Sequence, residues 1–392
     1  MALLEKRNLE RYRTLASVKT NSSGFPLYPP KASGIKGQRR LITSTGIFVI
    51  LAFLPWLPIL GWFTIFNPAT NYGLGNIAYV FAYAAAGVGF NLLIGYSGTL
   101  GLAHAGIFAL GAYGTAILSA PQECLDYDTC ETIIRPAVAG YGWPFLVALP
   151  VVCIVAALIG ALVGFPAARL KGFYLAIATL ALGELIVKLI SLDAKLWSGL
   201  KTNSGTGKQV PIFELFGSGQ LKSAYFISLA SLIITFVAYV IYTENRLGRT
   251  LKAVRDIEIA TGPLGISGTY YKLVAFGLSS FAAAFAGAAW AQNSAFVNPT
   301  SFRTRLLVFL LVVLILGGLG KLWGPLIGAF VFVYLRQEFQ DQQKLLFFLI
   351  GVALMLAILL LPEGFASLPD RMRDSRWVQD LRRRFKSAKV SS

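Results

Sequence analysis

The chain has 392 residues, of which 56% are hydrophobic and 14% are charged, and its formal net charge is +17. Water-soluble domains carry roughly a quarter charged residues, so this composition excludes an ordinary soluble protein. Apolar windows close to the roughly 20 residues that cross a bilayer recur along the chain, without the alternation of a membrane β-barrel. Because lipid cannot satisfy backbone polar groups, we expect an all-α fold, a polytopic transmembrane helical bundle.

The basic residues gather at the two ends of the chain. The first forty residues hold nine Lys and Arg against two acids, and the last 31 hold eight against four. Basic segments beside apolar spans mark the cytoplasmic side and contact anionic lipid, so we expect the bilayer, and no nucleic acid, as the partner. We predict a cytoplasmic arm over residues 1–40, which lacks the apolar core of a signal peptide, a transmembrane domain over 41–361 and a cytoplasmic tail over 362–392.

About ten membrane segments are expected in chain order. Pro55 and Pro58 should kink the first of them, because proline removes a helical hydrogen-bond donor and clashes with the preceding turn. The expected spans are 42–65, 74–94, 99–119, 143–165, 172–192, 223–242, 271–291, 304–317, 322–336 and 345–361.

The loop charges indicate the orientation of these spans. With the N-terminus inside, loop 120–142 falls outside, and it carries four acids against one arginine. The basic loop 243–268 then falls inside. The basic tail also falls inside only if 304–336 turns back within the membrane, which predicts a break at Gly317–Lys321. An even number of segments and two cytoplasmic termini follow.

This glycine-rich break resembles an earlier segment of the chain. Residues 94–100 and 316–322 share Gly, Gly and Leu at matching positions. Two interrupted helices at corresponding positions are typical of a transporter's pathway, although small residues also allow close helix packing, and the two roles are compatible. If the interrupted helices line a pathway, the candidate pathway residues are Gly95, Ser97, Gly98 and Gly320.

Two polar side chains are expected inside spans. Glu184 either meets a cationic group of a substrate or pairs with Lys188, one turn further along the helix. His104 either contacts the pathway or forms a hydrogen bond between helices. It is the single histidine, so it cannot build a metal site alone, and no catalytic constellation or cofactor motif accompanies it. Cys124 and Cys130 are left open between a disulfide and two free thiols.

The loop 243–268 carries the most informative pattern. Leu247, Leu251 and Val254 recur at helical spacing, with charged residues on the other faces, and Gly262-Pro263 should end the helix. A short amphipathic helix at this position either lies on lipid headgroups or docks into a groove on a partner protein.

The same loop resembles the coupling loop of ABC importer permeases. Glu244–Arg249, Ala253–Asp256 and Ile259-Ala260-Thr261-x-x-x-Gly265 match best the branched-chain and neutral amino-acid permeases of the LivM/LivH-like family. Gly95–Ala105, Arg169–Glu184 and Gly320–Ala329 continue the resemblance, which covers roughly residues 74–365. The Arg-Leu-Lys-Gly-Phe-Tyr block favours the LivM-like subunit. The basic N-terminal arm and Gly262-Pro263 depart from the family pattern.

The resemblance implies a non-enzymatic transport subunit in the bacterial inner membrane that imports branched-chain or other neutral amino acids. Its implied partners are a LivH-like sister permease, two cytoplasmic ABC ATPases and an external solute-binding protein. No complete phosphate-binding loop occurs in the sequence, since Ser204–Lys208 only imitates its end. The alternatives are a secondary transporter or channel without ATPases, an importer of urea or short amides and, more remotely, an intramembrane enzyme. The implied coupling residues are Leu247, Leu251, Val254, Arg255, Ile259, Ala260, Thr261 and Gly265.

Overall fold

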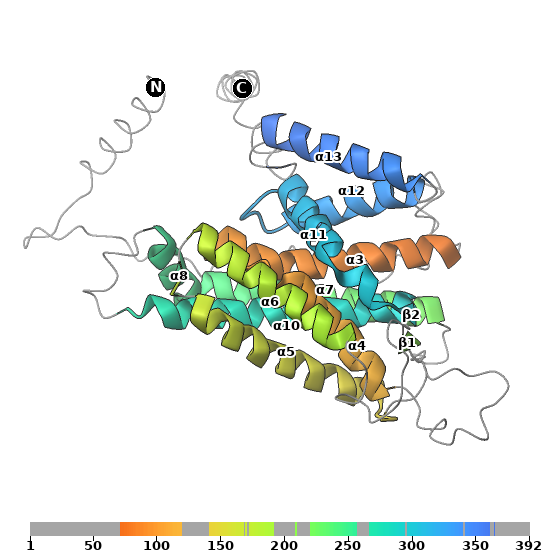
Figure 1. Cartoon of the computed structure of the whole chain (residues 1–392), viewed down its shortest axis with the longest axis horizontal. Helices are drawn as coiled ribbons and strands as arrows, with labels where there is room; N and C mark the ends of the chain where they lie inside the picture. The colour runs from red at the N-terminus through yellow and green to blue at the C-terminus, as the bar shows by residue number, and fades with distance from the viewer. Residues whose placement is uncertain are drawn as a thin grey trace, which may run out of the picture. The chain divides into compact units, whose positions relative to one another are not determined.

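The computed structural model is a bundle of helices (Figure 1). It describes residues 71–119, 141–167, 169–170, 172–191, 208–209, 220–256, 266–294, 296–339, 342–360 and 364. The helices are α3 (Asn71–Asn91), η4 (Leu92–Tyr96), α4 (His104–Ser119), α5 (Phe145–Ala167), α6 (Phe173–Ser191), α7 (Gln220–Glu244), α8 (Arg246–Asp256), α10 (Gly268–Ser294), η5 (Pro299–Phe302), α11 (Thr304–Gly317), α12 (Gly324–Glu338) and α13 (Gln343–Leu360). The expected span 42–65, the external cysteines and Gly262-Pro263 lie outside the described residues.

Every span expected after residue 70 corresponds to a helix, so the all-α prediction is confirmed. Within the described residues, five helices are long and apolar enough to cross a membrane, namely Gly73–Tyr96, Phe145–Pro166, Phe173–Ser191, Leu221–Glu244 and Gly268–Ser294. One boundary was wrong: the span expected at 99–119 becomes helical only at His104. The total number of crossings and the side of each terminus stay predictions.

Helices α3 and α10 form the centre of the bundle. In α3, 89% of the apolar window is buried, whereas in α6 the share is 22%. Helix α10 packs against α3, α4, α5 and α7. A Cβ on Gly111 of α4 would overlap the carbonyl oxygen of Ala284 on α10, and one on Gly287 of α10 would overlap that of Phe108. These two glycines therefore let the α4 and α10 backbones touch.

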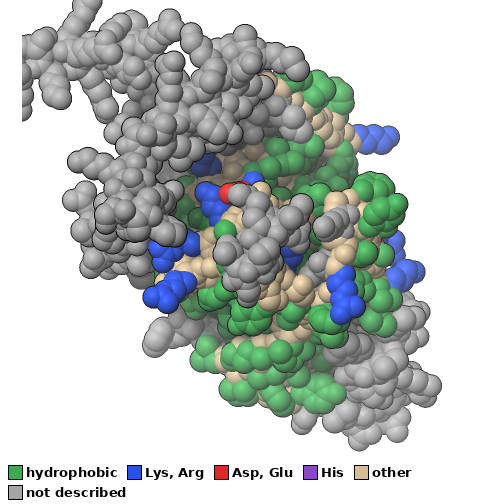
Figure 2. All heavy atoms as spheres, turned by 90° about the vertical axis from the view of Figure 1, so that its left-hand side faces the viewer, with side chains coloured by type: hydrophobic (Ala, Val, Ile, Leu, Met, Phe, Trp, Pro, Cys, Tyr) green, Lys and Arg blue, Asp and Glu red, His purple; other side chains and the backbone are tan. Residues whose placement is uncertain are grey.

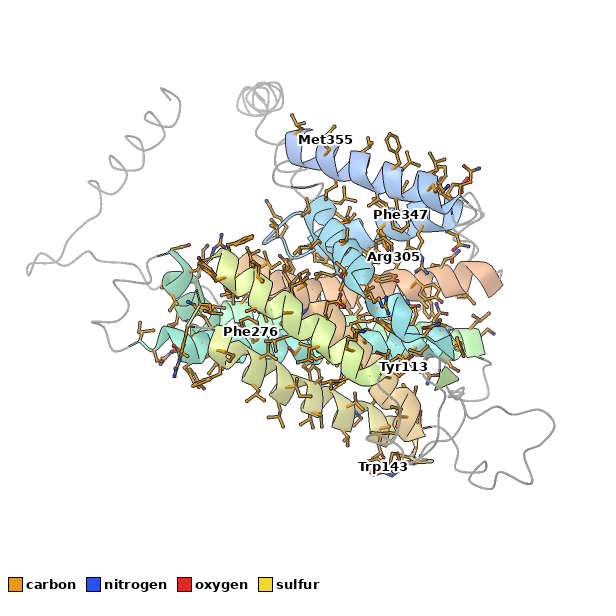
Figure 3. All side chains as sticks on the ribbon, viewed as in Figure 1. Tyr113, Trp143, Phe276, Arg305, Phe347 and Met355 are labelled. Atoms are coloured by element: carbon orange, nitrogen blue, oxygen red, sulfur yellow. The ribbon has the colours of Figure 1, made fainter. Side chains whose placement is uncertain are left out.

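Small residues also set the spacing between α5 and α10. Phe276, labelled on α10 in Figure 3, lies against Gly164 of α5. A Cβ on Gly164 would lie 2.9 Å from Cβ of Phe276. The outer side chains of α5 include Ile154, Leu158 and Leu162, which are exposed and apolar. Such a helix, apolar on all sides, suits a lipid or protein environment and not water.

Helices α11 and α12 form a hairpin that turns back, as the charge pattern predicts. They have 14 and 15 residues, and a helix of that length reaches roughly 21 Å, short of the roughly 30 Å hydrocarbon core. Gly318 and Gly320 between them have φ angles of 111° and 75°, values that glycine adopts at little cost. Pro325 lies in the first turn of α12, where its missing N–H is tolerated.

A short strand pair lies at the end of the bundle opposite α8 (Figure 1). Strand β1 (Lys208–Gln209) pairs antiparallel with β2 (Phe296–Val297), which joins the α6–α7 and α10–α11 connections. Tyr113, labelled near the end of α4 in Figure 3, donates a hydrogen bond to the carbonyl oxygen of Val297 at 3.0 Å. This end of the bundle is therefore cross-linked by backbone and side-chain hydrogen bonds.

Candidate functional site

The first helix break follows α3, where the chain widens into the π-helix η4. Ser97 and Thr99, which follow it, donate hydrogen bonds to a carbonyl oxygen that the widened turn frees. Ser97 Oγ donates to the carbonyl oxygen of Leu93 at 2.5 Å, and the Thr99 N–H bonds the same oxygen at 3.3 Å. Gly98 has a φ of 69°. The predicted interruption at Gly98 is therefore observed, as is the one at Gly320.

The two breaks contact each other through Asn91. Its side-chain Nδ2 donates to the carbonyl oxygen of Lys321 at 2.9 Å, and its Oδ1 accepts from the Gly320 N–H at 2.7 Å. A Cβ on Gly95 would lie 2.7 Å from the Gly320 nitrogen. The two segments that resemble each other in sequence therefore lie side by side. The side chain of Asn91, which is 1% exposed and precedes the first break, bonds the main chain of the second.

A further hydrogen bond ties the loop after the first break to α6. The Leu102 N–H donates to Thr179 Oγ1 at 2.9 Å. Thr179 lies seven residues beyond Gly172 in the α5–α6 turn, which corresponds to roughly 10 Å along a helix. Within a membrane, non-helical backbone is tolerated where protein buries it or where it lines a watery cavity.

Helix α8 packs against η4, α7 and α10. A tight turn after α7 places it there, because a Cβ on Gly248 would lie 2.6 Å from the Thr243 Cα. Leu251 and Val254 are 0% and 2% exposed. They anchor α8 to its own bundle, so the expectation that both face an ATPase is corrected. Leu247 is 37% exposed.

The outward face of α8 is basic. Arg246, Arg249 and Lys252 are exposed on it, together with Asp256. Figure 2 views the bundle from this end and shows Lys and Arg side chains gathered there, with little acidic surface among the described residues. The helix was expected over 244–261, and it is described as a separate helix over Arg246–Asp256. Ile259, Ala260, Thr261 and Gly265 lie outside the described residues.

His104 forms hydrogen bonds between helices, which is one of its two expected roles. Nε2 lies 3.1 Å from the carbonyl oxygen of Ala86 on α3, and Nδ1 lies 3.3 Å from Ser279 Oγ on α10. Its ring stacks on Phe90 with centroids 4.7 Å apart. Both ring nitrogens are therefore used within the protein, at the start of α4 beside the first break.

Glu184 is held by a partner that the sequence did not suggest. Its Oε1 accepts from the backbone N–H of Thr304 at 2.9 Å and from the Thr304 hydroxyl. It thus caps the N-terminus of α11, where unpaired N–H groups and the helix dipole favour a carboxylate. No ion pair joins it to the exposed Lys188 in the described chain. Glu184 also lies far from Gly320, because α11 separates them by roughly 20 Å.

We predict that Glu184→Gln leaves uptake nearly intact, because the amide oxygen still accepts both hydrogen bonds. Glu184→Leu should instead lower stability by about 1 kcal/mol, the usual cost of losing a helix cap. The midpoint of thermal unfolding in detergent and substrate uptake measure the two effects, with Lys188→Gln as the matched control. Uptake abolished by Glu184→Gln at unchanged stability would instead indicate a charge contact with substrate.

Sequence reasoning missed a cluster of aromatic residues around Arg336, near the C-terminal end of α12. Arg336 donates to the hydroxyl of Tyr83 on α3 at 2.9 Å, and the Trp290 indole donates to the same oxygen at 3.2 Å. The Arg336 guanidinium lies 5.7 Å from the Tyr79 ring centroid. A lone charge inside the expected span 322–336 was the signal that would have found it.

Comparison with known proteins agrees with this architecture. The family described as the permease component of branched-chain amino acid transport systems matches residues 73–360. The chain belongs to this family. The match begins in α3 and ends with α13, so it includes both helix breaks and α8.

The individual relatives that the chain resembles are also permeases. The chain is 31% identical over 309 residues to the high-affinity branched-chain amino acid permease LivM of Salmonella typhimurium, covering 72% of this chain and 67% of the relative. It is 25% identical to LivH of the same organism, over 74% and 92%. It is 24% identical to the ribose import permease RbsC of Haemophilus influenzae, over 49% and 60%. No solved structure gives a significant match.

Proposed function

We propose that this LivM-like permease carries branched-chain or other neutral amino acids inward in an ATP-driven complex. In it the chain pairs with a LivH-like sister permease, two cytoplasmic ATPases and an external solute-binding protein. The names of the LivM and LivH relatives, both high-affinity branched-chain amino acid permeases, support the substrate class. They also favour this reading over a secondary transporter. The substrate selectivity is expected to reside largely in the external binding protein.

The observation that carries the ATPase partnership is the position of α8. This helix is anchored to the bundle by Leu251 and Val254 and turns a basic face outward, at the end that the positive-inside rule assigns to the cytoplasm. A partner that pulls on α8 acts on α7 directly, because residue 245 alone separates the two helices. Helix α8 is thus suited to receive movement from a cytoplasmic protein and pass it to membrane spans.

Co-purification tests this partnership. The permease, sister subunit and ATPases are co-expressed, and the complex is isolated through a tag on this chain. We expect Arg249→Glu to remove most of the ATPase, because like charges across an interface cost several kcal/mol. Arg169→Glu is the matched control, since Arg169 is an exposed basic residue outside α8. Wild-type ATPase stoichiometry in Arg249→Glu would contradict docking through this face.

Uptake tests the transport cycle itself. Vesicles that contain the complex should accumulate labelled leucine only with ATP on the ATPase side and binding protein on the opposite side. Accumulation without ATPases would favour a secondary transporter. Transport of urea without competition by leucine would favour an importer of short amides.

A further inference from the structure

Arg255, in the last turn of α8, points back to the bundle and contacts the first helix break. Its Nη1 donates to the carbonyl oxygen of Gly95 at 2.6 Å. Its aliphatic stem lies against the exposed Gly98, where an added Cβ would lie 2.8 Å from Arg255 Cγ and 3.2 Å from Cδ. The absence of a side chain at Gly98 therefore makes room for the arginine. Arg255 is itself an exposed residue, but unlike Arg249 and Lys252 it donates a hydrogen bond to the break.

The end of the π-helix provides the acceptor for Arg255. The Ser97 N–H bonds the carbonyl oxygen of Leu92 and the Thr99 N–H bonds that of Leu93. Helix ends leave their last carbonyls without intrahelical donors, and the guanidinium reaches one of them, that of Gly95. A hydrogen bond from an ionised donor is shorter and stronger than a neutral one. Arg255 thus fixes the main chain of the break itself.

Asn91, one turn before Gly95, extends the contact to the second break. Both of its polar side-chain atoms bond main-chain groups, the Gly320 N–H and the Lys321 carbonyl oxygen. A continuous set of contacts therefore runs from α8 through Gly95 and Asn91 to the α11–α12 turn. Since the arginine and the asparagine both bond backbone atoms, a shift of α8 that keeps these bonds moves the main chain of the breaks.

We propose that Arg255 is a positioning residue that ties α8 to both helix breaks and transmits the movement of α8 to them. The role of α8 as the coupling helix rests on the proposed function. Movement of α8 then displaces the Gly95–Gly98 segment and, through Asn91, the Gly318–Gly320 turn. Both breaks shift as one unit, and a loss of the Arg255 contact uncouples this unit from the ATPases without detaching them.

The first experiment measures uptake per ATP hydrolysed in the assembled transporter. Arg255→Ala should keep its ATPases at wild-type stoichiometry and lower the uptake per ATP at least tenfold. Arg255→Lys keeps the charge on a shorter, single-point donor, so its uptake per ATP should lie between those of the wild type and Arg255→Ala. Asn91→Leu should also lower the ratio, and adding it to Arg255→Ala should cost little more because one pathway is already broken. Wild-type uptake per ATP in Arg255→Ala would overturn the proposal.

The second experiment needs no ATPase. Amide hydrogen exchange is measured on the purified chain over residues 93–99 and 317–321. Arg255→Ala should speed exchange severalfold in both segments, while the outward Arg249→Ala should change neither. Unchanged exchange over 317–321 in Arg255→Ala, or equal acceleration in both variants, would overturn the linkage. ATPases that fail to bind the wild-type chain would count against the proposed function, whereas linked exchange at both breaks would still support the linkage.

Discussion

Replacing Gly98 with valine should lower uptake at least tenfold while the protein still inserts and purifies. A β-branched residue is disfavoured at the φ of 69° observed there, and its Cβ would lie 2.8 Å from Arg255 Cγ. The left-handed conformation alone costs a non-glycine residue roughly 1–2 kcal/mol. The valine therefore both strains the break and displaces the arginine that holds it. Uptake in vesicles, normalised to the amount of assembled complex, measures the effect.

Valine substitutions at two other glycines distinguish the effect of backbone strain from that of the lost Arg255 contact. Gly172 has a φ of 57° with nothing within 4 Å of an added Cβ, so Gly172→Val introduces strain alone. Gly320 has a φ of 75°, and an added Cβ there would lie 3.7 Å from the Gly95 carbonyl oxygen, an ordinary contact distance. We expect the loss of uptake to follow the order Gly98, Gly320, Gly172. An equal loss at Gly98 and Gly172 would show that the Arg255 contact is unimportant.

Gly111→Ala should destabilise the protein by more than any glycine-to-alanine change on the bundle surface. The new Cβ would lie 2.5 Å from the Ala284 Cα and would overlap its carbonyl oxygen. These atoms belong to the backbone of α10, so no side-chain rotation relieves the contact. Overpacking of this kind costs about 1–3 kcal/mol or more. The midpoint of unfolding in detergent measures it, and Gly287→Ala on the facing helix should behave alike.

Gly351 provides the matched control for Gly111. It is also a glycine inside an apolar helix, α13, but an added Cβ meets nothing within 4 Å. Alanine there should raise stability by about 0.5–1 kcal/mol, because glycine loses more conformational freedom on folding. A Gly111→Ala protein as stable as Gly351→Ala would show that α4 and α10 are not packed as closely as described.

The spans and the α11–α12 hairpin were predictable from the sequence because both depend on local patterns. Apolar run length predicts a membrane helix. The hairpin followed from the position of basic residues relative to Gly317–Lys321, and from the weak repeat with residues 94–100. The buried face of α8 was also visible in the spacing of Leu251 and Val254, whereas Leu247, expected on the same face, is exposed. What the pattern did not reveal is which surface buries that face: it packs against its own bundle.

The contacts within the site were not predictable, because each joins residues far apart in sequence. Asn91 and Gly320 are separated by 229 positions, and Arg255 and Gly95 by 160. A polar residue in an apolar span signals a partner but does not name it. Glu184 illustrates this, since Lys188 one turn away was the obvious candidate and Thr304, 120 positions on, is the observed one.

The strand pair at the end opposite α8 ties the connection that follows α10 to the rest of the bundle. Helix α10 begins beside α8 and ends just before β2, and its 27 residues make it roughly 40 Å long. Strand β2 is bonded to β1 and to Tyr113, so the far end of α10 leads into a tethered segment. At a helix of that length, a tilt of about 5° sweeps the free end through roughly 3.5 Å. Because α10 contacts both α8 and η4, a tilt of that size would act at the end that holds Arg255 and Gly95, and the strand pair would hold the opposite end.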